Sequence, residues 1–120
     1  GLNGTLPIPF ASRIALFESK LLALVRQNIT KKTTLVAHPP PRGILDRVAN
    51  RFSAGSAGIR SLIDSHPPMM VLCGHIHEQA GFEYVKNTIV VNCALNKNSF
   101  GAIIDCNNDA PPKIKIIKRK

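Results

Sequence analysis

The stretch Val71-Leu72-Cys73-Gly74-His75-Ile76-His77-Glu78 decides how this chain is expected to fold, because an apolar run leads directly into a glycine and two histidines. In an extended segment, residues two apart point to the same side, so His75 and His77 can direct their imidazoles into one space. Such a pair, in a polar turn at the exit of a strand, suits metal ligation. Two hydrogen-bonded structural histidines are one alternative, and a structural zinc site that adds Cys73 is another.

A second apolar run, Thr33 to Ala37, ends at His38 and three prolines. Because prolines cannot continue a strand ladder, His38 is expected at the carboxyl end of a short buried strand. Between the two runs, Ser56 can cap a helix that ends before the next prolines, which predicts a parallel strand pair with a helical crossover. Ligands of open α/β sheets collect at the carboxyl ends of the strands, so the three histidines are expected to converge.

The remaining pattern predicts one more helix and several further strands. Apolar residues at spacings of three and four favour a helix from Ser12 to Gln27, with an apolar stripe of Ile14, Phe17, Leu21, Leu24 and Val25. Residues 42–55 are expected to form an irregular loop with one helical turn. Further strands are expected at 82–85, 88–92, 99–105 and 113–118, with turns at 86–87 and 107–112. This order of elements predicts an α/β fold.

Composition limits the class of protein. The chain has 120 residues, 44% of them hydrophobic, which predicts one globular domain or a portion of one over residues 1–120. No run approaches the roughly 20 apolar residues of a membrane span. Three cysteines without a CxxC pair favour reduced thiols and a cytoplasmic setting, with the cysteines as small buried hydrophobes.

The chain is strongly basic, with a formal net charge of +9. This charge suits contact with phosphate groups or nucleic acid, or a fragment whose acidic partner lies elsewhere. The Lys–Ile alternation from Lys113 to Lys118 could form a nucleic-acid-binding stripe. We favour an edge strand that avoids pairing with other chains, because lysines on an edge do this.

Three convergent imidazoles suit a zinc, manganese or iron ion. An ion held in this way lowers the pKa of bound water and polarises a phosphoryl or carbonyl oxygen. In the loop after His38, Arg42 and Arg47 are candidate bidentate donors to a substrate phosphate, with solvated loop charges as the alternative. Asp46 is expected to hydrogen-bond its own loop, and Asn92 is interpreted as a turn former.

Three segments together resemble the calcineurin-like metallophosphoesterase superfamily: Leu35-Val36-Ala37-His38-Pro39-Pro40, Cys73-Gly74-His75-Ile76-His77-Glu78 and Thr88-Ile89-Val90-Val91-Asn92. More narrowly, they are similar to its small bacterial and archaeal phosphoesterases. The opening Asn3-Gly4-Thr5-Leu6-Pro7-Ile8-Pro9-Phe10 resembles the loop after the family's Gly-Asn-His motif. The resemblance spans residues 3–106 and implies part of a layered α-β-β-α sandwich that lacks its N-terminal half.

The resemblance implies a role for each matching histidine. His38 and His75 would ligate one divalent ion and His77 a second one, with His75 at the catalytic centre. The implied cofactors are two divalent metal ions (manganese, iron or zinc), and the implied reaction is metal-dependent hydrolysis of a phosphoester.

The family's Asp-x-His, Gly-Asp and Gly-Asn-His motifs do not occur in this sequence, and Cys93-Ala94 departs from its usual Pro-Gly. We therefore expect the C-terminal half of a hydrolase, inactive or incomplete by itself. Its partner is expected to be the missing N-terminal half or a second copy of the chain. The alternative functions are a non-catalytic interaction module that keeps the fold and a basic nucleic-acid-binding domain.

Overall fold

The structure is a computed structural model that describes residues 20–107 and 110–118 of the chain. Its elements, in order, are helical residues 20–26, β1 (Thr34–Val36), β2 (Arg47–Val48), β3 (Phe52–Ser53), α2 (Ala57–Ser65), β4 (Met70–Cys73), the 3-10 helix η1 (His77–Gln79), β5 (Gly81–Val85), β6 (Thr88–Asn92), β7 (Ser99–Asn107) and β8 (Ala110–Lys118). The opening loop and the predicted helix start at Ser12 lie outside the described residues. The predicted turn at 86–87 is confirmed, and Lys86 adopts a left-handed φ of 55° there.

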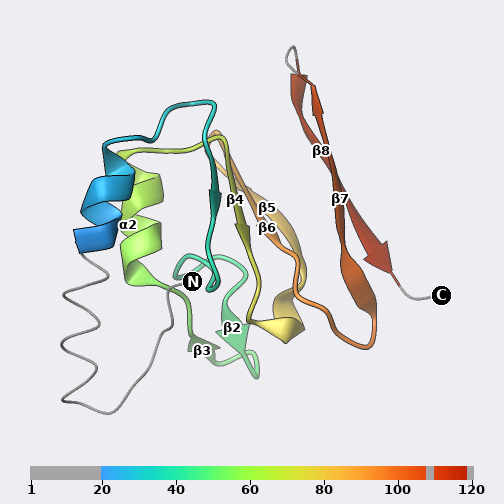
Figure 1. Ribbon diagram of the computed structural model, residues 1–120. Helices are drawn as coiled ribbons and strands as arrows, with labels where there is room; N and C mark the ends of the chain where they lie inside the picture. The colour runs from blue at the N-terminus through green and yellow to red at the C-terminus, as the bar shows by residue number, and fades with distance from the viewer. Residues whose placement is uncertain (1–19, 108–109, 119–120) are drawn as a thin grey trace.

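A four-stranded sheet in the order β1-β4-β6-β5 forms the centre of the fold (Figure 1). Strands β1, β4 and β6 are parallel, whereas β5 runs antiparallel to β6. The predicted parallel pair is confirmed by the register Thr34↔Met70 and Val36↔Leu72. Three parallel strands therefore bring their carboxyl ends, and the loops that follow them, to one edge of the sheet.

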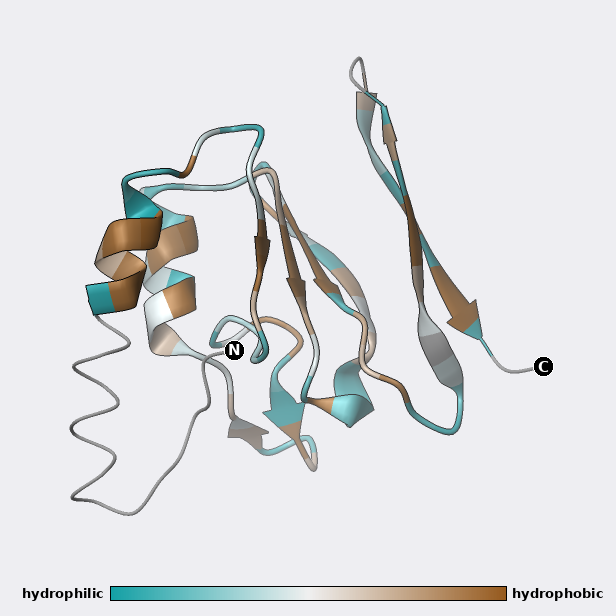
Figure 2. Ribbon diagram, viewed as in Figure 1, coloured by the Kyte–Doolittle hydropathy of each residue, from teal (hydrophilic) through white to brown (hydrophobic). Residues whose placement is uncertain are grey.

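The central strands β4 and β6 are buried because apolar layers cover both of their faces. On one face, the helical residues 20–26 and α2 pack through Leu22, Ile59, Leu62 and Ile63 against Val71 and Val90. Helix α2 begins where predicted: Ser56 is its N-cap and accepts a hydrogen bond of 3.1 Å from the backbone N–H of Ile59. Figure 2 shows the hydrophobic colour on these helices and on the central strands.

The hairpin β7–β8 covers the other face of the sheet (Figure 1). A second apolar cluster joins the two layers and contains Met70, Ile89 and Val91 of the sheet with Ala102, Ile104, Ile114 and Ile116 of the hairpin. Lysines alternate with these isoleucines along β8 and are exposed. Helices, sheet and hairpin form successive layers, which confirms the expected α/β class as part of a layered sandwich.

The first strand and the first helix differ from the expected pattern. Strand β1 lies at the edge of the sheet and its Val36 is 75% exposed, so the prediction of a buried strand is wrong there. In the first helix Leu22 enters the core, whereas Leu24 is 61% exposed. The predicted apolar stripe is therefore wrong at Leu21 and Leu24, which are exposed, and confirmed at Val25, which packs on the core together with Leu22, three residues before it.

The loop at residues 42–55 contains an antiparallel β2–β3 pair in place of the predicted helical turn. Leu45, Ala49 and Asn50 have φ values of 53°, 53° and 54°, and left-handed residues of this kind interrupt a right-handed helix. Farther along the chain, β8 starts at Ala110, so its two prolines lie in a strand rather than in the predicted turn. A strand that pairs on one side only tolerates proline.

No helix in the described part of the chain is long and apolar enough to span a membrane. The three cysteines are free, as expected from the sequence. Cys73 is buried and Cys93 is half-buried, but Cys106 is exposed, so its interpretation as a small buried hydrophobe is wrong. Cys106 is near the outer end of β7, where the hairpin extends beyond the cluster that it shares with the sheet.

Candidate metal centre

Two of the predicted ligands meet at the carboxyl edge of the sheet. His38 follows β1 and His75 follows β4, and these two strands are parallel neighbours. The hydrogen bonding between them extends past the strand ends, because the N–H of Gly74 donates to the carbonyl of His38 at 2.9 Å. His38 Nε2 lies 2.9 Å from His75 Nδ1, so one of these nitrogens carries a hydrogen and the other accepts it. The ring centroids are 4.7 Å apart with the planes tilted by 58°. Both side chains are exposed to solvent.

The backbone at His75 adopts an unusual conformation. Its φ is 69°, in the left-handed region that residues other than glycine rarely occupy. The N–H of Ile76 donates to the carbonyl of Gly74 at 2.8 Å, which closes a tight turn around His75. Conformations of this kind persist only where the surrounding structure holds them, and they concentrate at functional sites.

His77 does not join the other two histidines. It is the first residue of η1, it is exposed, and its carbonyl accepts a hydrogen bond of 2.6 Å from Asn96 Nδ2. The extended geometry predicted for residues 75–77 is wrong, because His75 is left-handed and the chain then enters a 3-10 turn. Across residues 20–107 and 110–118, no group of three or more His, Cys, Asp or Glu side chains could hold one metal ion. The ligand role of His77 stays a prediction.

Asn92 is a residue of the site that sequence reasoning treated only as a turn former. Its side chain is fully buried at the carboxyl end of β6. Its Nδ2 donates to the carbonyl of Ile76 at 2.9 Å and to that of Leu45 at 3.3 Å, and its Oδ1 accepts from the N–H of Ala94 at 3.0 Å. The sequence did contain a signal for this role. Asn92 is a polar residue at the end of a strand that is mostly apolar, and His38 and His75 likewise come after the ends of apolar strands.

The loop after His38 is closed around a buried carboxylate. Asp46 is 1% exposed, and its Oδ2 accepts from the backbone N–H groups of Gly43 and Gly55 at 2.9 and 3.0 Å. This confirms the prediction that Asp46 bonds to its own loop. Glu78 Oε2 accepts from the N–H of Ala49 at 2.8 Å and thereby ties η1 to the same loop. Both carboxylates therefore already have backbone partners.

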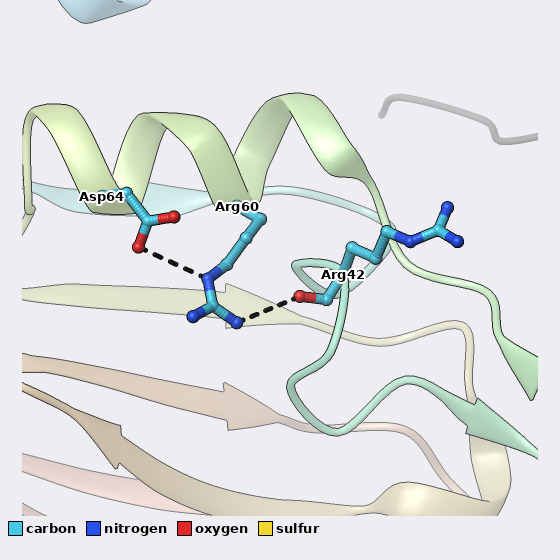
Figure 3. A network of polar contacts seen from close by, with 3 residues as sticks. All are labelled: Arg42, Arg60 and Asp64. Atoms are coloured by element: carbon cyan, nitrogen blue, oxygen red, sulfur yellow. Dashed lines mark hydrogen bonds and ion pairs between the residues drawn. The ribbon is translucent and has the colours of Figure 1, made fainter.

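The two candidate phosphate-binding arginines do not contact the histidine pair. The carbonyl of Arg42 accepts from Arg60 Nη1 at 3.3 Å, while Arg60 Nε lies 3.4 Å from Asp64 Oδ1. The guanidinium of Arg42 extends away from these two residues (Figure 3). A surface hollow of about 480 Å³ lies here, lined by Arg42, Ala57, Arg60, Ser61, Asp64 and Ser65. Arg47 is exposed on β2, opposite Ser53. A phosphate contact by either arginine stays a prediction.

Cys73 does not support the structural zinc alternative. Burial, with a smaller contribution from nearby Cys93, raises the pKa of the Cys73 thiol to about 12. Its Sγ lies 3.4 Å from the carbonyl of Val91, to which it can donate. Among the described residues, Cys73 belongs to no group of three possible ligands that could hold a metal ion.

The two imidazole nitrogens of His38 and His75 could supply two of the ligands of a divalent metal ion. Imidazole nitrogens suit zinc, manganese and iron, and two of them face each other at an exposed edge where solvent and ligand have access. Both donors are neutral when they bind a metal, and one oxygen each of Asp46 and Glu78 accepts hydrogen bonds from the backbone. His38 and His75 can therefore hold an ion only together with ligands that come from outside this pair.

The fold of this chain is similar to that of a known protein. One solved crystal structure superposes with a TM-score of 0.66 and 28% sequence identity. The match covers 86% of this chain but 39% of the other, so this chain spans well under half of its structural neighbour. A comparison with curated protein sequences gave no match.

A protein-family model described as metallophosphoesterase, calcineurin superfamily, matches residues 13–115, nearly the whole chain. Proteins of this superfamily are in general phosphoester hydrolases, and they typically use divalent metal ions. The matched range contains both strands that lead into the histidine pair, together with the Asn92 strand and most of the hairpin. The layered α/β fold, the paired histidines and this match lead to one conclusion: the chain belongs to the calcineurin superfamily of metallophosphoesterases.

Proposed function

We propose that this chain supplies the histidine side of a dinuclear metal centre in a phosphoester hydrolase. One observation carries the proposal: His38 Nε2 and His75 Nδ1 lie 2.9 Å apart at the ends of adjacent parallel strands, with His75 in a left-handed conformation. Metal ligation accounts for both features, because it requires two lone pairs directed at one point and a backbone that fixes the ring. A solvated histidine needs neither.

In this proposal His38 and His75 bind one ion, and His77 binds the second. Manganese, iron and zinc all accept imidazole nitrogen. When bound, two such ions activate a water molecule and stabilise negative charge on the phosphoryl oxygens of the substrate. Ligation uses the two nitrogens that now share a hydrogen bond, so His38 and His75 exchange their mutual hydrogen bond for the ion. Arg42 and Arg47 remain the candidate contacts for the substrate phosphate.

The remaining ligands are proposed to come from another part of a longer protein or from a partner chain. Two dications need negative ligands, and among the described residues no carboxylate joins the histidine pair to make a group of three possible ligands. The structural neighbour is more than twice as long as its region of match, which leaves room for a second half. The isolated chain is accordingly proposed to be incomplete as a catalyst. Self-association is the second way in which further ligands could be supplied.

The other functions are less well supported. In β8 the lysines alternate with isoleucines that pack on the sheet, so this alternation is explained by the hairpin and does not require nucleic acid. A cytoplasmic setting is part of the proposal, because three free cysteines suit a reducing compartment. A non-catalytic interaction module would keep this fold without needing the histidines to bind metal.

Titration of the 120-residue chain with Co²⁺ alone, followed by calorimetry, tests the proposal. We expect His75→Ala and His38→Ala each to weaken binding by at least about tenfold, because each removes one of two ligands. His66→Ala is the matched control, since His66 is also exposed but lies at the C-cap of α2 and contacts Ser65. Equal Co²⁺ binding by wild type, His75→Ala and His66→Ala would contradict the proposal and favour the non-catalytic module.

A further inference from the structure

Asn92 occupies a position where an apolar side chain would be expected. It ends β6 after Ile89, Val90 and Val91, it pairs with Cys73 of β4 and with Gly81 of β5, and none of its surface is exposed. Burying a carboxamide in such a place costs free energy unless its donors and acceptor find partners. The identity of those partners therefore shows what the residue does.

The three hydrogen bonds that the Asn92 side chain makes with described residues go to backbone groups of different segments. Nδ2 donates to Leu45, which lies in the loop that follows His38, and to Ile76, which lies between His75 and His77. Oδ1 accepts from Ala94, two residues beyond the end of β6. One side chain thus joins the segments that leave the carboxyl ends of all three parallel strands.

Two of these segments have backbone conformations that need support. Leu45 has a φ of 53°, and its own carbonyl accepts a hydrogen bond from Asn92. His75 has a φ of 69°, and the carbonyl of the next residue, Ile76, accepts the other hydrogen bond. Because one carboxamide nitrogen binds both carbonyls, it fixes the spacing between the loop after His38 and the turn that carries His75. Among the described residues, Gln79 also donates to the Ile76 carbonyl, at 3.2 Å, but Gln79 lies in the same turn and cannot fix that spacing.

We infer that Asn92 is a positioning residue for the His38–His75 pair: its carboxamide holds the two ligand-bearing segments in the register that metal binding requires. The inference rests on the proposed metal role of the histidines. It assigns to Asn92 no contact with metal or substrate. Outer residues that orient metal ligands in this way typically change metal affinity by about 10–100-fold when they are replaced.

The test compares Asn92→Ala with Thr88→Val in the 120-residue chain. Thr88 is the matched control, because it is equally buried at the opposite end of β6 and donates its hydroxyl to the carbonyl of Pro68 at 2.7 Å. In the same strand, Thr88→Val loses one buried hydrogen bond from side chain to backbone, and Asn92→Ala loses three. Only Asn92→Ala is expected to affect the histidines.

Two readouts separate positioning from general stability. Co²⁺ affinity, with Co²⁺ as the sole probe, is expected to fall about 10–100-fold in Asn92→Ala and to stay at the wild-type level in Thr88→Val. Without metal, NMR-detected hydrogen exchange of the Gly74 amide, which donates to His38, is expected to accelerate in Asn92→Ala relative to Thr88→Val. Asn92→Ser keeps a shorter donor and is expected to give intermediate values for both.

Each remaining outcome overturns a specific statement. Co²⁺ binding that His75→Ala abolishes but Asn92→Ala leaves unchanged would overturn this inference and leave the proposed function intact. Co²⁺ binding that survives His75→Ala would overturn the proposed function and this inference with it. If Asn92→Ala and Asn92→Ser both unfold while Thr88→Val folds, or if Thr88→Val loses as much affinity, Asn92 acts on the whole fold and is not a positioning residue.

Discussion

His38 and His75 are 37 residues apart in the chain, yet their ring nitrogens Nε2 and Nδ1 lie within 2.9 Å of each other. The contact follows from the topology, since β1 and β4 are adjacent and parallel, and each histidine follows its strand. Helix α2 lies between these strands in the chain and covers one face of the sheet that they form. The stability of α2 and of its contacts with the sheet therefore bears directly on the histidine pair.

Replacement of Leu62 by alanine is expected to destabilise the protein by about 2–5 kcal/mol, because it leaves a cavity between α2 and the sheet. Leu62 is fully buried in the cluster that contains Val71 and Val90. Urea denaturation followed by circular dichroism measures the change. Leu24→Ala is the control, with an expected change within about 0.5 kcal/mol, because Leu24 is 61% exposed. Equal losses for the two leucines would contradict the packing described for α2.

Replacement of Asp46 by alanine is expected to cost about 2–3 kcal/mol of stability, because it leaves the N–H groups of Gly43 and Gly55 without their acceptor. The same substitution at Asp64 is the control. Asp64 is 52% exposed and pairs with Arg60 across one turn of α2, so its loss is expected to cost under about 1 kcal/mol. Thermal unfolding of both variants measures the difference. An Asp46→Ala variant as stable as Asp64→Ala would show that the carboxylate does not hold the loop.

The pH dependence of stability is expected to carry a contribution from Cys73. Burial raises the pKa of its thiol from 9.0 to about 12, so the unfolded state releases this proton at a lower pH than the folded state does. The contribution is therefore complete below pH 9.0 and is lost as the pH rises towards about 12. Urea unfolding of wild type and Cys73→Ala from pH 8 to pH 11 measures it.

In this comparison we expect the stability of wild type relative to Cys73→Ala to fall as the pH rises above 9.0. Cys106→Ala, which removes an exposed cysteine, is the control for loss of a thiol as such. A constant difference between wild type and Cys73→Ala across this range would contradict the burial of Cys73 behind α2.

Much of the fold was accessible from the sequence because its signals are local. Apolar runs that end in His38 and in Gly74-His75 indicated two strands, and Ser56 with Ile59, Leu62 and Ile63 marked the helix between them. Since a strand, a helix and a second strand in this order form a parallel pair, the meeting of His38 and His75 was predictable as well. The alternation of lysine and isoleucine likewise indicated β8.

The rest depends on contacts between distant parts of the chain, which periodicity does not encode. The hydrogen bond from Asn92 to Leu45 joins residues 47 positions apart. Because of such bonds Asn92 connects three segments, whereas the sequence indicated only a turn former. Leu45, Ala49 and Asn50 are left-handed in a loop whose ends are joined through Asp46 to Gly43 and Gly55. The sequence predicts an extended segment at residues 75–77, but the structure has a φ of 69° at His75 and begins η1 at His77. The order of apolar and polar residues does not indicate either feature.

The central claim is that His38 and His75 are metal ligands, and anomalous diffraction from crystals of the chain grown with Co²⁺ tests it most directly. We predict a cobalt peak at bonding distance, about 2.0–2.2 Å, from both His38 Nε2 and His75 Nδ1. A well-ordered pair of imidazoles that keep their mutual hydrogen bond, with cobalt absent or bound only elsewhere, would contradict the account.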